Sequence, residues 1–101
     1  MGDQWFLTIA LEAGGITLRL ARLCEQGTYL LGADTALRTA LPFPPGVAER
    51  EPLQQHIISL QGALGLTAFQ ESWTAGATDP LERVARSATV SLESIAQAAI
   101  A

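Results

Sequence analysis

The sequence contains no lysine, one cysteine (Cys24) and one histidine (His56), and only 16% of its 101 residues are charged. The six basic residues are arginines scattered along a chain of net charge −4, so no basic stripe is available to neutralise phosphates. We therefore expect no direct binding to nucleic acid. A single cysteine excludes an intrachain disulfide framework and fits a reducing cytoplasm.

The same scarcity limits the chemistry that the chain could perform. A zinc site needs several Cys or His ligands, and a Cys24–His56 thiolate pair would lack an identifiable orienting residue. The Gly14-Gly15 step lacks the Lys-Ser/Thr of a phosphate-binding loop. Asp34 has no partner acid or base nearby in sequence, and we expect it to accept a hydrogen bond from a neighbouring helix end or turn. The expectation is a non-enzyme with no catalytic residues, cofactor or metal.

The first residues, MGDQWFLTIALEAGG, carry an acid and no basic segment, which argues against a signal peptide. Their apolar run is too short and too interrupted to span a membrane. We therefore expect a cytoplasmic protein with no membrane contact.

Hydrophobic residues are abundant, at 49% of the chain. This content argues against disorder, and the length suits one domain over residues 1–101. Because few charges remain to cover the outside, an exposed apolar patch that meets a partner is expected.

The C-terminal quarter predicts a helix over about 80–99. Asp79 is a suitable N-cap, and Pro80 suits the first helical position. Apolar residues then recur at helical spacing as one stripe: Leu81, Val84, Ala85, Ala88, Leu92, Ile95, Ala96 and Ala99.

Two further helices are predicted over about 47–64 and 68–75. Leu53, Ile57, Leu60 and Leu64 form one stripe of the first, and Pro52 either marks its first turn or bends it. Gly65 and Gly76 are expected to end these two helices. Thr67 and Gln70 have the spacing of a capping box at the start of the second.

The N-terminal third is ambiguous. It alternates well enough for a β-hairpin turning at Gly14-Gly15, within a β-meander over residues 4–31. It also fits a helix over about 4–21 with two apolar faces, which would have to be buried between neighbours. One face would hold Trp5, Ile9, Ala13, Ile16 and Leu20, and the other Leu7, Leu11 and Leu18.

The stretch TYLLGADTALRTALPFPPG, residues 28–46, predicts a helix and its stop. Gly32 beside Ala33 and Ala36 favours close contact with another helix. The prolines in LPFPPG disfavour helical geometry in the residues before them and so end the helix.

Taken in order, these elements resemble the C-terminal helical tail of bacterial LuxR-type and AfsR-type signalling ATPases that regulate transcription. The resemblance covers residues 11–85, about three quarters of the chain. It rests on an ordered series: Leu30-Leu31-Gly32-Ala33, Leu41-Pro42, Pro44-Pro45, Leu64-Gly65, Phe69, Trp73 and Gly76, then Leu81, Glu82 and Val84. The chain departs from the family at Gly15 and Gly27, where alanine is common, at Pro52, and in the turn ARLCEQ.

The resemblance implies an all-α fold of tetratricopeptide-like antiparallel helical hairpins followed by a C-terminal helix. It favours the helical alternative for the N-terminal segment, giving five helices over about 3–21, 25–41, 47–64, 68–75 and 80–99. The implied function is a protein–protein interaction and regulatory module in signal transduction. Its partner would be another protein, neighbouring repeats of a larger chain, or a second copy in a homodimer. The competing hypotheses are a small α+β ligand-binding or enzyme domain and a self-associating structural domain.

Phe69 and Trp73, four residues apart, are expected to form a wedge between the helix over 47–64 and the last helix, or else an exposed aromatic anchor. The residues expected to carry packing or interaction are Trp5, Leu30, Gly32, Ala33, Leu37, Phe69, Trp73, Leu92 and Ile95.

Overall fold

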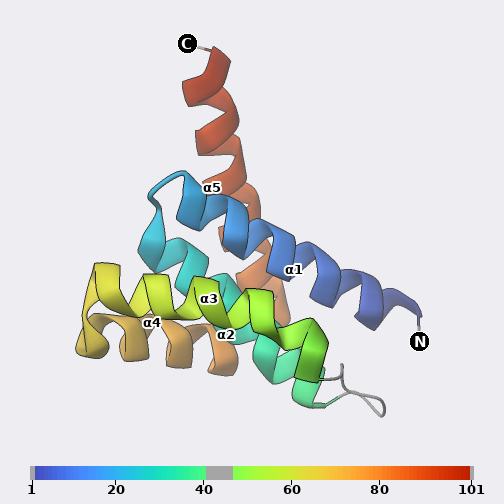
Figure 1. Ribbon diagram of the computed structural model, residues 1–101. Helices are drawn as coiled ribbons and strands as arrows, with labels where there is room; N and C mark the ends of the chain where they lie inside the picture. The colour runs from blue at the N-terminus through green and yellow to red at the C-terminus, as the bar shows by residue number, and fades with distance from the viewer. Residues whose placement is uncertain (1, 41–46, 101) are drawn as a thin grey trace.

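The structure is a computed structural model that describes residues 2–40 and 47–100, with side chains described for residues 10–40 and 53–98. These described residues form five α-helices and no strand. The helices are α1 (Gly2–Leu20), α2 (Cys24–Thr39), α3 (Val47–Leu64), α4 (Leu66–Thr78) and α5 (Leu81–Ile100), as Figure 1 shows. The predicted all-α fold is therefore confirmed. The alternative β-meander over residues 4–31 is wrong, because α1 and α2 occupy that segment. The tetratricopeptide-like arrangement of the helices stays a prediction.

The boundary between α3 and α4 lies where the sequence predicts it. Gly65 separates the two helices with a φ of 82°, a left-handed conformation that side-chain-bearing residues rarely adopt. The predicted capping box is wrong, because α4 begins at Leu66, Thr67 lies within it, and the Gln70 amide donates to the Thr74 hydroxyl over 3.1 Å. Pro52 lies inside α3. The predicted stop over Leu41–Gly46 lies outside the described residues.

Gly76 does not end α4, which continues to Thr78. The last helix also begins one residue later than predicted. The carbonyl of Pro80 accepts hydrogen bonds from the backbone amides of Arg83 (2.9 Å) and Val84 (3.1 Å). Pro80 therefore occupies the N-cap position that we predicted for Asp79. Asp79 instead accepts a hydrogen bond from the Tyr29 hydroxyl over 2.7 Å, which joins the α4–α5 connection to α2.

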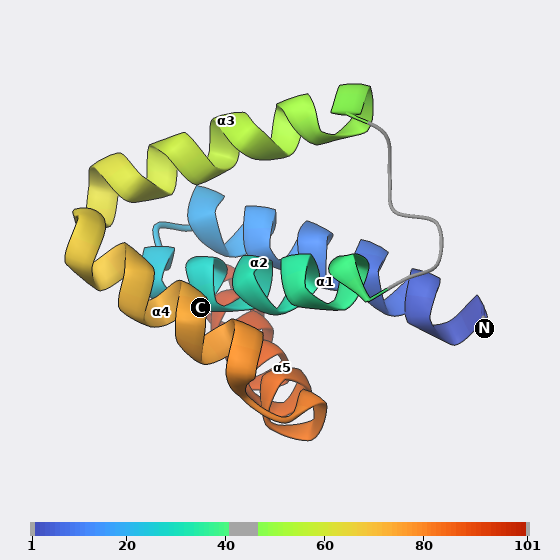
Figure 2. The same ribbon diagram turned by 90° about the horizontal axis from the view of Figure 1, so that it is seen from below.

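Helix α2 lies at the centre of the molecule and contributes to two separate hydrophobic clusters. One side supplies Leu30 and Ala33 to a cluster with α1 and α5, and another supplies Leu31 to a cluster with α3 and α4. Figure 2 shows α2 between the α3 and α4 arms of the V-shaped hairpin that turns at Gly65. The first cluster comprises Leu11, Leu18, Leu30, Ala33 and Val84, and the second Leu31, Leu60 and Phe69.

The first helix does not bury two apolar faces within its described side chains. Leu11 and Leu18 are buried, whereas Ala13 and Leu20 are exposed and Ile16 is half-buried. The helix with apolar neighbours on both sides is α2, because it supplies residues to both clusters. The sequence prediction assigned this role to the wrong helix, since hydrophobic periodicity does not show which helix the others surround.

Glycines bring the backbone of α2 into contact with α4. A Cβ atom at Gly32 would overlap the carbonyl oxygen of Trp73, and one at Gly76 would overlap the carbonyl oxygen of Tyr29. The two helices therefore cross with their backbones touching, which confirms the close contact that the sequence predicts at Gly32. Gly76 provides the other side of the same crossing.

A second glycine pair brings α2 against α1. A Cβ at Gly27 would lie 2.8 Å from the carbonyl oxygen of Gly15, and one at Gly15 would lie 2.7 Å from Cγ of Leu31. Neither position has room for a methyl group without movement, so the close approach of α1 and α2 favours glycine at both.

We expect Gly32→Ala and Gly76→Ala to destabilise the fold by about 1–3 kcal/mol or more, since backbone atoms cannot move aside by changing rotamer. The matched control is Gly62→Ala, where an added Cβ on α3 meets nothing within 4 Å. That variant should gain about 0.5–1 kcal/mol from helix propensity. Urea unfolding followed by circular dichroism measures all three, and a stabilised Gly32→Ala variant would contradict the close crossing.

Candidate interaction surface

A group of polar side chains joins α1, α2 and α3, and we refer to it as the polar seam. It comprises Glu12, Arg19, Asp34, Arg38 and His56. Arg38 on α2 binds Asp34 on the same helix, with Nε 3.0 Å from Oδ1 and 3.1 Å from Oδ2, and its Nη2 lies 2.6 Å from Oε2 of Glu12 on α1. Asp34 is completely buried. Arg38 therefore pairs with two carboxylates at once and links α2 to α1, and this arrangement serves packing between helices. The expectation that Asp34 binds a helix end or turn is wrong, because its partner is the Arg38 side chain one turn along.

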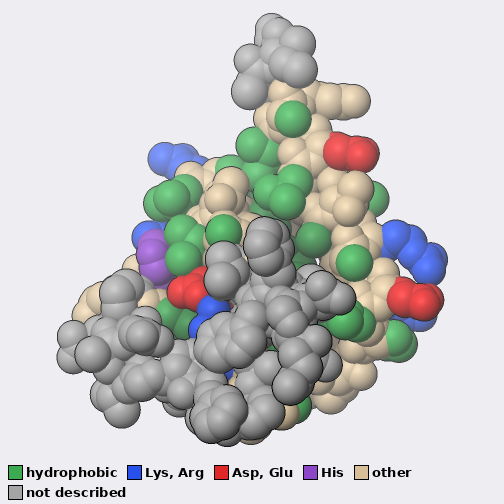
Figure 3. Space-filling view, turned by 90° about the vertical axis from the view of Figure 1, so that its right-hand side faces the viewer, with side chains coloured by type: hydrophobic (Ala, Val, Ile, Leu, Met, Phe, Trp, Pro, Cys, Tyr) green, Lys and Arg blue, Asp and Glu red, His purple; other side chains and the backbone are tan. Residues whose placement is uncertain are grey.

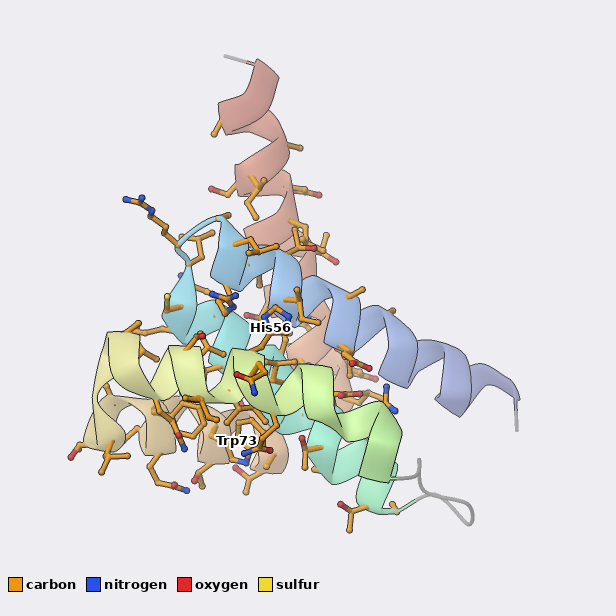
Figure 4. All side chains as sticks on the ribbon, in the orientation of Figure 1. His56 and Trp73 are labelled. Atoms are coloured by element: carbon orange, nitrogen blue, oxygen red, sulfur yellow. The ribbon has the colours of Figure 1, made fainter. Side chains whose placement is uncertain are left out.

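Arg19 of α1 and His56 of α3 form the second contact of this seam. Arg19 donates from Nε to Nδ1 of His56 over 2.8 Å, so the imidazole accepts the bond as a neutral ring protonated on Nε2. Burial and the adjacent Arg19 charge lower the pKa of His56, whereas the Glu12 carboxylate acts in the opposite direction. Figure 4 shows His56 on the side of α3 nearest α1. Within the described residues no hydrogen bond joins His56 to Cys24, whose thiol is half-buried.

Burial dominates the titration of Asp34. It raises the pKa of the Asp34 carboxyl from 3.8 to about 6, although the Arg38 guanidinium acts in the opposite direction. The folded state therefore retains a proton between about pH 4 and pH 6 that the unfolded chain has already lost. In this window the free energy of unfolding falls as the pH rises, because the unfolded state binds fewer protons. Ionised Asp34 consequently destabilises the neutral-pH fold by about 3 kcal/mol.

We expect the stability of the wild type, relative to Asp34→Asn, to increase by up to about 3 kcal/mol as the pH falls from 7 to 4. The contribution of His56, whose lowered pKa acts in the opposite direction, is common to both proteins and cancels in the difference. Denaturant unfolding at several pH values measures this difference. Two parallel stability curves would show that Asp34 titrates normally.

Thr28 carries a buried hydroxyl with no hydrogen-bond partner in the described part of the chain. The residue is 0% exposed on α2, and an unpaired hydroxyl in an apolar environment is costly.

Thr28→Val should therefore stabilise the protein by about 1 kcal/mol, because it removes the unpaired group at nearly constant shape. Thr17→Val serves as the control, since the exposed Thr17 hydroxyl bonds the Ala13 carbonyl over 2.8 Å, and it should shift stability by less than about 0.5 kcal/mol. Thermal or denaturant unfolding compares the two, and a loss of stability in Thr28→Val alone would indicate a satisfied hydroxyl.

Two open hollows are lined by described residues. One, of about 330 Å³, lies between α2, α4 and the start of α5, and it is lined by Glu25, Gln26, Tyr29, Glu71, Ser72, Ala75 and Ser87. The other, of about 490 Å³, lies where α3 meets α4, beside Leu66 and Phe69. In the first hollow, burial and the hydrogen bond to Asp79 raise the pKa of Tyr29 to about 12, so its hydroxyl stays protonated. The described residues contain no group of three or more candidate metal ligands.

Most of the predicted packing residues lie inside the molecule. Leu30 and Ala33 are in the first cluster, which Leu37 and Ile95 flank as partly buried neighbours. Gly32 forms the α2–α4 crossing. The prediction for Trp5 lies outside the described side chains.

Phe69 and Trp73 form a stacked pair, with ring centroids 5.5 Å apart. Phe69 is buried with Leu31 and Leu60, and Trp73 packs beside it, partly exposed. Figure 4 shows Trp73 on α4. The wedge therefore lies between α3 and α2. The expectation that the wedge faces the last helix is wrong, because the close α2–α4 crossing places α2 beside the aromatic pair instead.

The apolar residues of α5 divide into a buried set and an exposed set, and the sequence alone does not show this division. Val84 is buried against α1 and α2, with Ala88 and Ile95 packed beside the same cluster. Leu81 is 46% exposed and Leu92 38% exposed, and Ala85 and Ala96 are exposed as well. The single predicted stripe is thus two adjacent stripes, of which only one enters the core. We refer to Leu81, Ala85, Leu92 and Ala96 as the α5 stripe.

The C-terminal half of α5 projects beyond the other helices, as Figure 1 shows. Figure 3 shows hydrophobic side chains on the projecting part of the molecule. Val90, 66% exposed, lies on the same helix away from the α5 stripe. This helix therefore presents apolar side chains to the surroundings over several turns. None of the helices in the part of the chain that the structure describes combines the length and the apolarity needed to cross a membrane.

Sequence reasoning missed Glu12, Arg19 and Arg38. The spacing of Asp34 and Arg38, four residues apart on a helix, is a signal that could have identified one pair. Glu12 and Arg19 lie on α1. The pairing of Glu12 with Arg38 and that of Arg19 with His56 therefore become visible only in the folded chain.

Comparison with known proteins adds no further information, since no protein-family model, curated protein or solved structure matches the chain.

Proposed function

We propose that this chain is a cytoplasmic, non-enzymatic helical module that binds another protein and serves a regulatory role. The observation that carries the proposal is the α5 stripe, which stays exposed although Val84, Ala88 and Ile95 of the same helix pack into the core. An exposed row of apolar side chains on a projecting helix is a surface that a protein partner can cover.

The polar groups of the chain support the same proposal. Arg38 pairs with both Asp34 and Glu12, and Arg19 with His56, so each of these groups already has a partner within the fold. Side chains engaged in this way hold helices together. Catalysis would instead call for a nucleophile or base directed into a cleft.

The resemblance to the C-terminal tail of bacterial signalling ATPases suggests the setting of this module. It would act in signal transduction that controls transcription, packed against a partner protein or against neighbouring repeats of a larger chain. What supports this setting is the helix order and the helix–glycine–helix junction at Gly65, both of which the resemblance implies.

Site-specific photocrosslinking tests the proposed surface. We expect a photoreactive amino acid at Ala96, within the α5 stripe, to form covalent adducts with protein in irradiated cells. The matched control places the same group at Ser94, which is exposed on the opposite side of the helix. Combining the Ala96 probe with Leu92→Glu should lower the adduct yield several-fold, because a buried carboxylate opposes contact.

Adducts with a second copy of the chain or with a different protein would both support a protein-binding role. Equal yields at Ala96 and Ser94, or no adduct at either position, would refute the α5 stripe as an interaction surface. Circular dichroism of each variant verifies that the helices remain folded.

A further inference from the structure

Helix α3 is attached to the other helices by an apolar cluster and by one hydrogen bond. Leu60 is the one fully buried side chain among those described for α3, and it packs with Leu31 of α2 and Phe69 of α4. In the described part of the chain, the bond from Arg19 to His56 is the single hydrogen bond between a side chain of α3 and another helix. The polar link between α3 and α1 therefore consists of this contact.

The Arg19–His56 contact requires a neutral imidazole. The guanidinium of Arg19 is always charged and can only donate, so Nδ1 of His56, 2.8 Å from Nε of Arg19, must carry no proton. A proton added to the ring occupies Nδ1, removes the acceptor and sets two positive charges at hydrogen-bond distance. Protonation therefore turns an attraction between α1 and α3 into a repulsion.

The described acid that acts on His56 is already paired. Glu12 of α1 favours the charged imidazole, but its carboxylate is bound by Nη2 of Arg38 over 2.6 Å. Arg38 in turn binds Asp34, so the charges of α2 nearest this contact are also engaged. Glu12 consequently offsets only part of the repulsion between Arg19 and a protonated His56.

The other titratable groups of the helices around α3 have different surroundings. Glu25 of α2 and Glu71 of α4 line the hollow between α2, α4 and α5, and Glu71 also lines the hollow where α3 meets α4. Tyr29 is hydrogen-bonded at the α4–α5 connection, and the thiol of Cys24 packs beside the second hydrophobic cluster. His56 is the one charged or titratable side chain among those described for α3. Acid titration at the α1–α3 contact therefore centres on His56.

The α3–α4 junction can absorb a rotation of α3. Gly65 is exposed with a φ of 82°, and an added Cβ there would meet nothing within 4 Å. Figure 2 shows α3 as the outermost helix on its side of the molecule, joined to α4 at this glycine. Helix α4 is held separately, by its backbone crossing with α2 at Gly32 and Gly76. Rotation at Gly65 thus moves α3 without disturbing the α2–α4 crossing.

We propose that α3 is a pH-sensitive conformational switch, in which protonation of His56 breaks the Arg19 contact and releases α3 from α1 by rotation about Gly65. Burial and the Arg19 charge lower the pKa of His56, so the contact is intact at neutral pH and is lost as the pH falls through this lowered value. Release uncovers the apolar cluster at Leu31 and Phe69. The switch goes beyond the proposed function, because it involves α3 rather than the α5 stripe.

Amide hydrogen exchange of the purified full chain, measured at several pH values between about 7 and 5, tests the switch. Protection factors, which remove the pH dependence of chemical exchange, are compared helix by helix. We expect the protection of α3 to fall about tenfold over this range, because the released state binds a proton more tightly, whereas that of α2 and α4 should not fall. His56→Gln should abolish the fall in α3, since its amide oxygen accepts from Arg19 but does not titrate.

Removal of the donor is the complementary variant. Arg19→Met should lower the protection of α3 about tenfold already at neutral pH, and it should weaken the pH dependence of that protection. The matched control is Arg86→Met on α5, which is exposed and should behave like the wild type. Circular dichroism verifies that each variant is folded.

Equal protection of α3 in the wild type at both ends of the pH range would overturn the switch. An equal fall in His56→Gln, a fall of the same size in every helix, or wild-type behaviour of Arg19→Met would overturn it as well. The Ala96 photocrosslink is measured at neutral pH, where α3 is bound. Failure of the switch therefore leaves the proposed function intact, and failure of the α5 stripe leaves the switch intact.

Discussion

The contact of the α2 backbone with its neighbours is the constraint on which the rest of the structure depends. Gly32 and Gly76 allow α2 and α4 to touch, and Gly15 and Gly27 do the same for α1 and α2. Helices that approach this closely gain many dispersion contacts, although each glycine lowers helix propensity by roughly 1 kcal/mol relative to alanine. Between these close contacts α2 supplies apolar residues to both clusters, which also include residues of α3 and α5.

This central position of α2 determines which apolar residues stay outside. Among the described side chains of α5, Val84, Ala88 and Ile95 pack into or against the core, and its second apolar row stays exposed. A chain with few charges cannot cover such a row with polar side chains, and the row remains available to a partner. The interaction surface that we propose is thus a consequence of how the core is assembled.

The charged side chains of the polar seam, unlike the exposed apolar row of α5, have partners within the fold. Asp34 is completely buried beside the α1–α2 contact, and its charge is compensated by Arg38. Arg38 in turn reaches Glu12, so the buried acid, the arginine and the second acid form one connected group. Compensation is incomplete, because burial still raises the pKa of Asp34 to about 6. Such a group specifies how α1 and α2 are aligned, although the buried charge of Asp34 destabilises the fold at neutral pH.

The sequence by itself determined the bounds of α3 and the close contact at Gly32, whereas the N-terminal third stayed open between a helix and a β-hairpin, and the all-α prediction rested on the resemblance. The bounds and the contact depend on local signals: helical periodicity, a left-handed glycine at Gly65, and small residues grouped together. Only the tertiary structure decided the role of Gly76, the neighbour of the Phe69–Trp73 pair, the partners of Asp34, and the division of α5 into buried and exposed rows. Each of these depends on which helices meet and at what distance. That choice follows from the packing of all five helices together, and periodicity along one helix contains no information about it.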